Sequence, residues 1–215
     1  MAAHWDDKDV LTTESELREL FGEPAQAARD KVRKTLGEFD RIWLAHSPYC
    51  LIGTSAADGS CDVSPKGDPP GFVMPLDDST IAIPERQGNR RIDGFRNLLS
   101  NPRVGLLSLI PGRNDSLRIN GRATFVREAP FFDRMVVRGH RPALALVIEI
   151  EELFYHCGKS AIRSQVWRPE TWAPDEVPSR ARIAQALERK DWTLEQLEEY
   201  YGPKYEEGVY NLKLG

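Results

Sequence analysis

The chain has 215 residues, 40% of them hydrophobic and 29% charged, which fits one domain with a sizeable core. Its net charge of −4 gives no global attraction to nucleic acid or to an anionic membrane, and no stretch is long and apolar enough to span a bilayer. No export signal is visible and the three cysteines lack metal-ligand spacing, so we expect a reduced, cytoplasmic protein without a metal site.

Residues 1–45 are predicted to form helices that pack on a larger domain. Thr13-Glu14-Ser15-Glu16 is a capping-box pattern, and it begins a helix that ends at Gly22. A second helix is expected from Pro24 to about Leu36, and a short third helix follows through residues 39–44. We assign no chemistry to these helices.

From Pro48 onward the pattern changes to short strands joined by hairpin turns, such as the turn at Asp58-Gly59. The strands are expected at residues 49–54, 61–64, 72–76, 80–84, 103–110 and 116–126. They follow one another in hairpin order with one helix inserted after the fourth, which favours an antiparallel barrel in which closure removes the free edges. A helix that begins at Pro130 and a buried strand at 143–150 are predicted to follow.

The inserted helix is preceded by Gly88-Asn89-Arg90-Arg91. Asn89 suits the N-cap, so Arg90 and Arg91 would occupy the first two helical positions. Each cation there costs some tenths of a kcal/mol up to about 1 kcal/mol unless an anion offsets it. Because arginine presents a planar fork of donors to phosphate oxygens, the pattern indicates either a phosphate-binding site or two solvated surface arginines.

Two other strands carry polar residues of interest. Prolines and glycines interrupt the ladder from Ser64 to Gly71, and a bulge there would turn Ser64 and Lys66 out of the sheet. They would then bind a phosphate or a flavin carbonyl, or belong to an ordinary polar loop. Along residues 116–120, Leu117 and Ile119 are expected on one face; the polar residues on the other face are either exposed or line a cavity.

The order of several segments resembles the FMN-binding split-barrel proteins, and more narrowly their bacterial branch similar to pyridoxamine 5′-phosphate oxidase. The resemblance runs from about residue 40 to residue 167 and rests on residues 64–72, 83–84, 88–91, 101–107 and 117–123. It implies a mainly β fold, a six-stranded antiparallel split barrel over residues 46–167, with peripheral helices and a helical tail over residues 168–215. It also implies a homodimer with one FMN at each of two sites between the subunits.

The resemblance further implies residue roles. Arg90 and Arg91 match the basic pair that binds the FMN phosphate, and residues 63–66 match a strand that runs along the flavin. The cofactor-binding residues are therefore expected to be Val63, Ser64, Pro65, Lys66, Ile83, Pro84, Asn89, Arg90, Arg91, Ser116 and Arg118. A second set would face the flavin ring or substrate from the partner subunit, unless it is a solvated surface: His156, Lys159, Arg163 and Trp167.

Two departures limit what the resemblance implies about activity. Pro84-Glu85 stands where the characterised oxidases have an aromatic-hydroxyl pair, and their substrate-phosphate motif of Arg, Leu and His is not found near the C-terminus. FMN binding is thus better supported than vitamin B6 chemistry. We expect an FMN-dependent oxidoreductase acting on a small organic substrate, with a non-catalytic flavin or haem carrier as the alternative. A phosphate-ester hydrolase would need a metal site or a nucleophile, and neither pattern is present.

Overall fold

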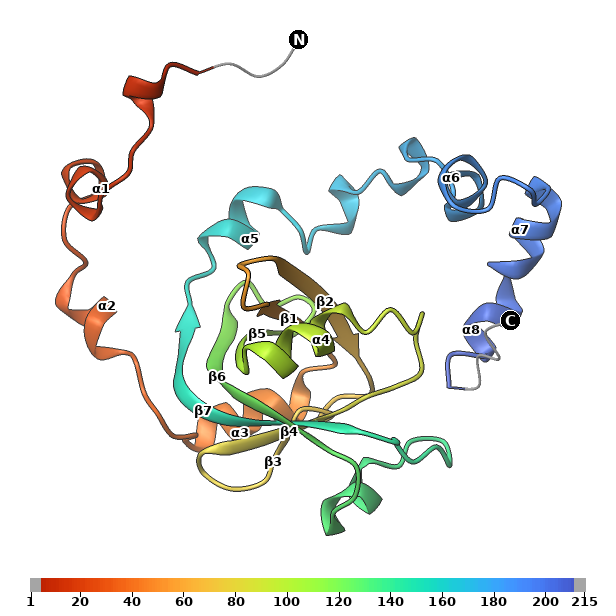
Figure 1. Ribbon diagram of the computed structural model, residues 1–215, viewed down its shortest axis with the longest axis horizontal. Helices are drawn as coiled ribbons and strands as arrows, with labels where there is room; N and C mark the ends of the chain where they lie inside the picture. Colours follow the sequence, from red (N-terminus) through yellow and green to blue (C-terminus); the bar gives the residue numbers. More distant parts are fainter. Residues whose placement is uncertain (1–4, 211–215) are drawn as a thin grey trace. The chain divides into compact units, whose positions relative to one another are not determined.

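The computed structural model describes residues 5–210, except for the side chains of Asp7 and Lys204. The chain divides into two compact units, Met1–Val32 and Arg33–Gly215 (Figure 1). The first unit contains η1 (Asp7–Asp9), α1 (Glu14–Phe21) and α2 (Gln26–Asp30). The capping box predicted for α1 is confirmed, because the Thr13 hydroxyl accepts from the Glu16 N–H and the Glu16 carboxylate accepts from the Thr13 N–H.

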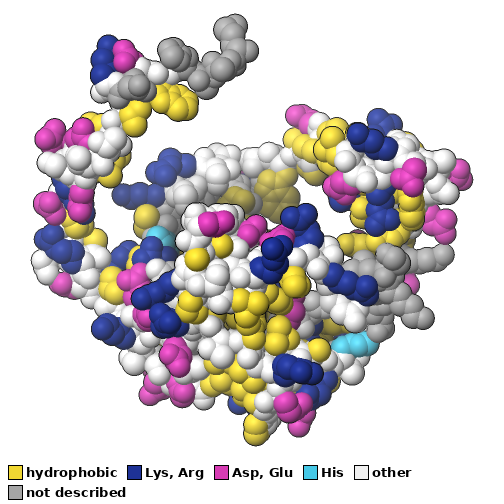
Figure 2. Space-filling model, viewed as in Figure 1, with side chains coloured by type: hydrophobic (Ala, Val, Ile, Leu, Met, Phe, Trp, Pro, Cys, Tyr) yellow, Lys and Arg dark blue, Asp and Glu magenta, His cyan; other side chains and the backbone are white. Residues whose placement is uncertain are grey.

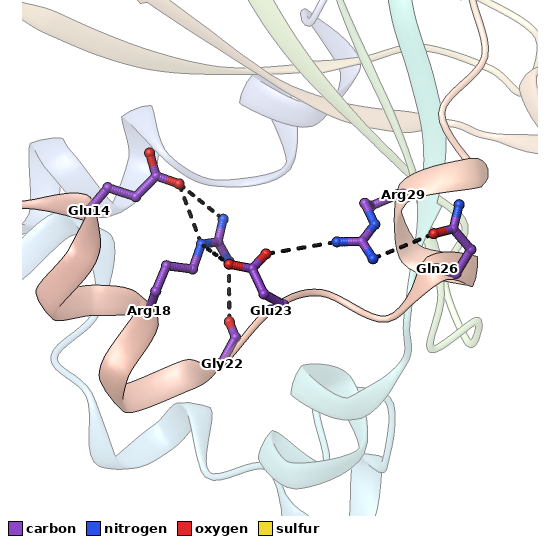
Figure 3. Close-up of polar contacts among 6 residues, drawn as sticks. All are labelled: Glu14, Arg18, Gly22, Glu23, Gln26 and Arg29. Carbon is purple, nitrogen blue, oxygen red and sulfur yellow. Dashed lines mark hydrogen bonds and ion pairs between the residues drawn. The ribbon is translucent and has the colours of Figure 1, made fainter.

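Exposed ion pairs connect α1 with α2 in this first unit. Arg18 contacts Glu14 at 3.2 Å and Glu23 at 3.8 Å, and Arg29 contacts Glu23 at 3.8 Å (Figure 3). Exposed pairs of this kind contribute about 0–1 kcal/mol each. Neither α1 nor α2 buries a residue in the described structure, so the packing of these helices on the sheet stays a prediction.

The second helix is shorter than expected. It ends at Asp30 instead of about Leu36, because Arg33 forms an antiparallel bridge with Leu153: each N–H donates to the other's carbonyl oxygen, at 3.0 and 2.7 Å. The backbone at Arg33 is therefore extended and cannot continue the helix, and the second unit begins at this residue.

The second unit is built on one antiparallel sheet of seven strands in the order β2-β1-β5-β6-β7-β4-β3 (Figure 1). The strands are β1 (Tyr49–Ser55), β2 (Cys61–Gly67), β3 (Met74–Pro75), β4 (Thr80–Pro84), β5 (Arg103–Leu109), β6 (Ser116–Val126) and β7 (Ala145–His156). The expected six-stranded closed barrel is therefore wrong: within residues 5–210 the sheet has seven strands and β2 and β3 remain its edges. β3 is only two residues long because Pro75 cannot donate to a ladder; the edge position of β2 accommodates Pro65 for the same reason.

The ladder between β6 and β7 contains a β-bulge at Gly121. The β6–β7 register shifts between Asn120 and Gly121, and a Cβ atom at Gly121 would overlap the carbonyl oxygen of Glu149. Bulges bend strands and increase their twist.

Although the sheet is open, its two end regions approach each other, since Lys66 at the end of β2 forms an ion pair with Glu85 just after β4.

The main core lies under β1, β5 and β6, whose alternate residues are buried as predicted for Leu117 and Ile119. Helix α3 (Glu38–His46) adds Trp43 and Leu44 to this core. The Trp43 indole N–H donates to the Ser108 hydroxyl at 3.1 Å, which satisfies both buried polar groups. α4 (Asp93–Ser100) lies against β1 and β2.

The helix expected from Pro130 is present after β6 as η2 (Pro130–Met135), a 3₁₀ helix. The remaining helices are α5 (Lys159–Ser164), η3 (Pro169–Thr171), η4 (Pro174–Glu176), α6 (Arg180–Leu187), α7 (Leu194–Tyr200) and α8 (Pro203–Glu207). Thr193-Leu194-Glu195-Gln196 is a second capping-box pattern in the sequence, and this capping box is present at the start of α7. α6 and α7 share a small apolar cluster around Ala184 and Leu197.

Candidate functional site

A cavity of about 500 Å³ lies between β2, the end of β4 and the first turn of α4. Apolar side chains form much of its wall: Ile52, Ile83, Phe95, Leu98, Leu144 and Leu146. β2 and β4 lie far apart in the strand order, so the cavity occupies the gap where the two end regions of the open sheet approach. Its volume is in the range of small-molecule and cofactor sites, about 300–1,000 Å³.

Most of the predicted cofactor-binding residues line this one cavity. They are Val63, Ser64, Pro65, Lys66, Ile83, Asn89, Arg90 and Arg91. Pro84 lines a separate cavity of about 110 Å³ next to Met135, because consecutive residues of a strand point to opposite faces.

The two other members of that set, Ser116 and Arg118, lie on the far face of β6, away from the buried Leu117 and Ile119. Arg118 donates to Glu152 at 2.6 Å, and its Nε is buried with no hydrogen-bond acceptor among the described residues. Neither residue lines the cavity within a single chain.

The residues expected from a partner subunit also lie outside the cavity: His156, Lys159, Arg163 and Trp167. His156 is paired with Ser116 across the β6–β7 ladder, whereas Lys159 and Arg163 belong to α5. Their contribution across a subunit boundary stays a prediction.

The predicted placement of the arginine pair within the helix is wrong. α4 begins at Asp93, because Arg90 (φ 61°) and Ile92 (φ 52°) adopt left-handed backbone conformations that cannot continue a right-handed helix. Asn89 does not cap α4; its Oδ1 accepts from the Arg91 N–H at 3.1 Å in a tight turn. Such strain costs about 1–3 kcal/mol per residue and is typical of functional segments.

The arginines differ in their charge partners. Arg91 donates from Nε to Asp93 Oδ2 at 2.7 Å, whereas Arg90 is exposed and has no ion pair among the described residues. Arg90 is therefore available for a bound anion, and Arg91 would share its guanidinium between Asp93 and that anion.

The other two cations at the cavity are neutralised. Lys66 pairs with Glu85 and lies 5.2 Å from the centroid of the Phe95 ring. Arg86 donates from Nε to Asp68 at 2.6 Å and from a terminal nitrogen to the Met135 carbonyl oxygen at 2.7 Å. Arg86 thus forms part of the cavity wall, and it is not free to bind a ligand phosphate.

A buried network that we did not predict from the sequence fixes α4 next to the cavity. Asn97 is 7% exposed, and its Nδ2 donates to Thr54 Oγ1 at 3.1 Å and to Asp62 Oδ2 at 2.8 Å. These bonds connect α4 to β1 and β2. A Cβ atom at Gly94 would lie 3.3 Å from Thr54 Oγ1, so the glycine permits this close approach. The available signal was an asparagine three residues after Gly94, a spacing that places the two residues on one face of the helix.

The described lining residues of the cavity include hydroxyl groups but no histidine or cysteine. Across residues 5–210 no group of three or more His, Cys, Asp or Glu side chains is placed to hold a metal ion. None of the helices in this range is both long and apolar enough to cross a bilayer. On the face drawn in Figure 2, acidic and basic side chains are interspersed. The cavity is an apolar pocket, and Arg90 is the cation at its rim that has no ion pair among the described residues.

Comparison with known proteins identifies the family. The family model described as pyridoxamine 5′-phosphate oxidase matches residues 37–157, which include the strands β1 to β7 and α4. The chain belongs to the pyridoxamine 5′-phosphate oxidase family. Among curated protein sequences, none matches this chain significantly.

Solved structures similar to this family member include HupZ from Group A Streptococcus, with 19% identity, 56% of this chain and 93% of that chain covered, and a TM-score of 0.45. A Clostridium acetobutylicum protein of the pyridoxine phosphate oxidase family, related to general stress protein 26, has 15% identity, coverages of 54% and 83%, and a TM-score of 0.38. HutZ, the haem storage protein from Vibrio cholerae, has 17% identity, coverages of 53% and 89%, and a TM-score of 0.39.

Proposed function

We propose that this chain binds FMN in the cavity between β2 and β4 and acts as an FMN-dependent oxidoreductase on a small organic substrate. The observation that carries the proposal is that one cavity collects three segments distant in the sequence: residues 63–66, Ile83 and residues 89–91. These are the segments that the family resemblance assigns to the cofactor.

The residues present fit the chemistry of FMN. The exposed Arg90 and the adjacent Arg91 present donors suited to a phosphate at the rim, while Ile52, Ile83 and Leu98 offer an apolar surface to an aromatic ring system. Lys66 adds a donor beside that surface. FMN supplies hydride or electron transfer when bound, and the protein supplies orientation, electrostatics and exclusion of water.

A haem carrier of the same fold is less well supported. Haem iron is held by His, Cys, Met or Tyr side chains. None of the described residues that line the cavity is of these types. An axial ligand would have to come from a second subunit.

We also propose that the functional form is a homodimer in the cytoplasm. On this proposal, His156, Lys159, Arg163 and Trp167 approach the cofactor from the partner subunit, and the face of β6 that carries Ser116 and Arg118 lies toward that subunit. The Arg118 and Glu152 side chains on this face support it, because they are 36% and 35% exposed and a second chain can reach them. Sedimentation analysis with and without FMN tests the oligomeric state.

The proposal is tested by titrating the purified protein with FMN and following the flavin absorption and fluorescence. The double variant Arg90→Ala/Arg91→Ala should raise the Kd about 30-fold or more, because a hydrogen bond to a charged group contributes about 1.5–3 kcal/mol. Arg96→Ala is the matched control: Arg96 is exposed on α4, next to the site, but does not line the cavity.

A protein that takes up no FMN, or a double variant that binds it as tightly as Arg96→Ala, would contradict the assignment. A Soret band with haem and no uptake of FMN would favour the carrier. Bleaching of the bound flavin by NADH or NADPH under anaerobic conditions separates an enzyme from a non-catalytic flavin binder.

A further inference from the structure

The last described residue of the chain, Tyr210, lies against the sheet-containing part of its own unit. Its hydroxyl donates to the Asp68 carboxylate, and its ring stacks on the His140 imidazole with centroids 5.8 Å apart and an interplanar angle of 10°. The guanidinium carbons of Arg86 and Arg138 lie 5.7 and 5.6 Å from the ring centroid. We call Asp68, Arg86, Arg138 and His140 the tyrosine socket.

The socket is held together by its own hydrogen bonds. The Asp68 side chain is 2% exposed and that of Arg86 15% exposed. Arg86 donates to Asp68 Oδ2, to the His140 carbonyl oxygen at 3.2 Å and to the Met135 carbonyl oxygen. The Tyr210 hydroxyl takes the other carboxylate oxygen, Asp68 Oδ1. Three separate chain segments, after β2, after β4 and after η2, therefore meet where Tyr210 docks.

The socket shares a residue with the cavity. Arg86 lines the cavity between β2 and β4, and it also contacts the Tyr210 ring. The rim segment from Gln87 to Arg91 follows Arg86 directly in the chain. The position of Tyr210 is thus coupled to a wall of the cavity through one guanidinium group.

We propose that Tyr210 anchors the C-terminal segment to the tyrosine socket and that this anchor controls exchange of the ligand in the cavity. When Tyr210 leaves, Asp68 loses a donor and Arg86 loses the ring that covers it, so the wall that Arg86 forms is less constrained. Because coupling between two sites is reciprocal, a ligand in the cavity also favours the docked tail. The identity of the ligand as FMN rests on the function proposed above; the anchor itself does not.

The anchor is tested with Tyr210→Phe, which removes the hydroxyl but keeps the ring. Tyr205→Phe is the matched control, because Tyr205 contacts Tyr200 and Tyr201 within the tail and does not belong to the socket. Amide hydrogen exchange between Tyr205 and Tyr210 is measured first, without flavin. Loss of a hydrogen bond to a charged acceptor should speed this exchange about tenfold in Tyr210→Phe and leave it unchanged in Tyr205→Phe.

The second measurement is the rate of FMN dissociation, which should rise several-fold in Tyr210→Phe alone. Unchanged hydrogen exchange in Tyr210→Phe overturns the anchor, and faster exchange with an unchanged dissociation rate overturns its control of the cavity. If the protein binds no FMN, the proposed function fails while the first measurement still decides the anchor. Equal effects of the two variants would also overturn the proposal.

Discussion

Replacing Asn97 with alanine tests whether the buried network of α4 holds the cavity in shape. The side chain amide makes two hydrogen bonds, one to the Thr54 hydroxyl at 3.1 Å and one to the Asp62 carboxylate at 2.8 Å. The alanine variant keeps the helix, since alanine is the best helix former, but it leaves both partners without their donor.

The magnitude follows from the kinds of bond lost. A neutral hydrogen bond contributes about 0.5–1.5 kcal/mol, and a bond to a charged group about 1.5–3 kcal/mol. Asp62 is only half-buried and regains water in the variant, which removes part of the second contribution. We therefore expect the free energy of unfolding to fall by about 2–3 kcal/mol.

Urea denaturation followed by tryptophan fluorescence measures this difference, because Trp43 lies in the main core. Arg96→Ala, on the exposed side of the same helix, should change the free energy of unfolding by less than about 0.5 kcal/mol. A loss below about 0.5 kcal/mol in Asn97→Ala would refute the reasoning, because the two bonds would then contribute no more than a surface contact.

Two further predictions concern the ion pairs of Asp40 with Arg33 and of Asp93 with Arg91. Burial alone would raise the pKa of the Asp40 carboxyl group, but hydrogen bonds from Arg33 and the Gly37 N–H hold this pKa below its ordinary value. Because the native pKa is depressed, the stabilisation is present above about pH 4 and is lost as the pH falls through the native pKa. The free energy of unfolding should therefore depend less on acidic pH in Asp40→Asn than in the parent, and an equal dependence in the two proteins would contradict this. Asp93→Asn frees the Arg91 guanidinium and removes a negative charge near the proposed phosphate site. Calorimetric titration should therefore give a Kd for FMN about two- to fivefold lower than that of the parent. A higher Kd in the variant would show instead that Asp93 assists binding.

Local patterns in the sequence predicted those parts of the structure that depend on neighbouring residues. The capping boxes at Thr13 and Thr193 were predictable because both partners lie within one turn. The burial of Leu117 and Ile119 followed from strict alternation along one strand. Among the cavity residues, Ser64 and Lys66 were also indicated by the prolines and glycines that follow them, whereas Val63 and Pro65 were found through the family resemblance alone.

The parts that were missed depend on contacts between distant segments. The left-handed backbone at Arg90 and Ile92 has no marker in the sequence, since glycine is the usual residue there. β7 continues to His156, beyond the expected end at residue 150, because β6 provides partners along its whole length. Whether a sheet closes also depends on which strands reach its edges, and hairpin order alone does not determine this.

The location of the cavity between two regions of one open sheet has a consequence for the folding equilibrium. A molecule bound there contacts β2 from one side and the end of β4 from the other, two segments that share no backbone ladder in the described structure. Such a molecule bridges these two segments, as hydrogen bonds between the first and last strands do in a closed β-barrel. A ligand that binds only the folded state stabilises it by RT ln(1 + [L]/Kd), so the ligand concentration becomes one of the variables that set the midpoint of thermal unfolding.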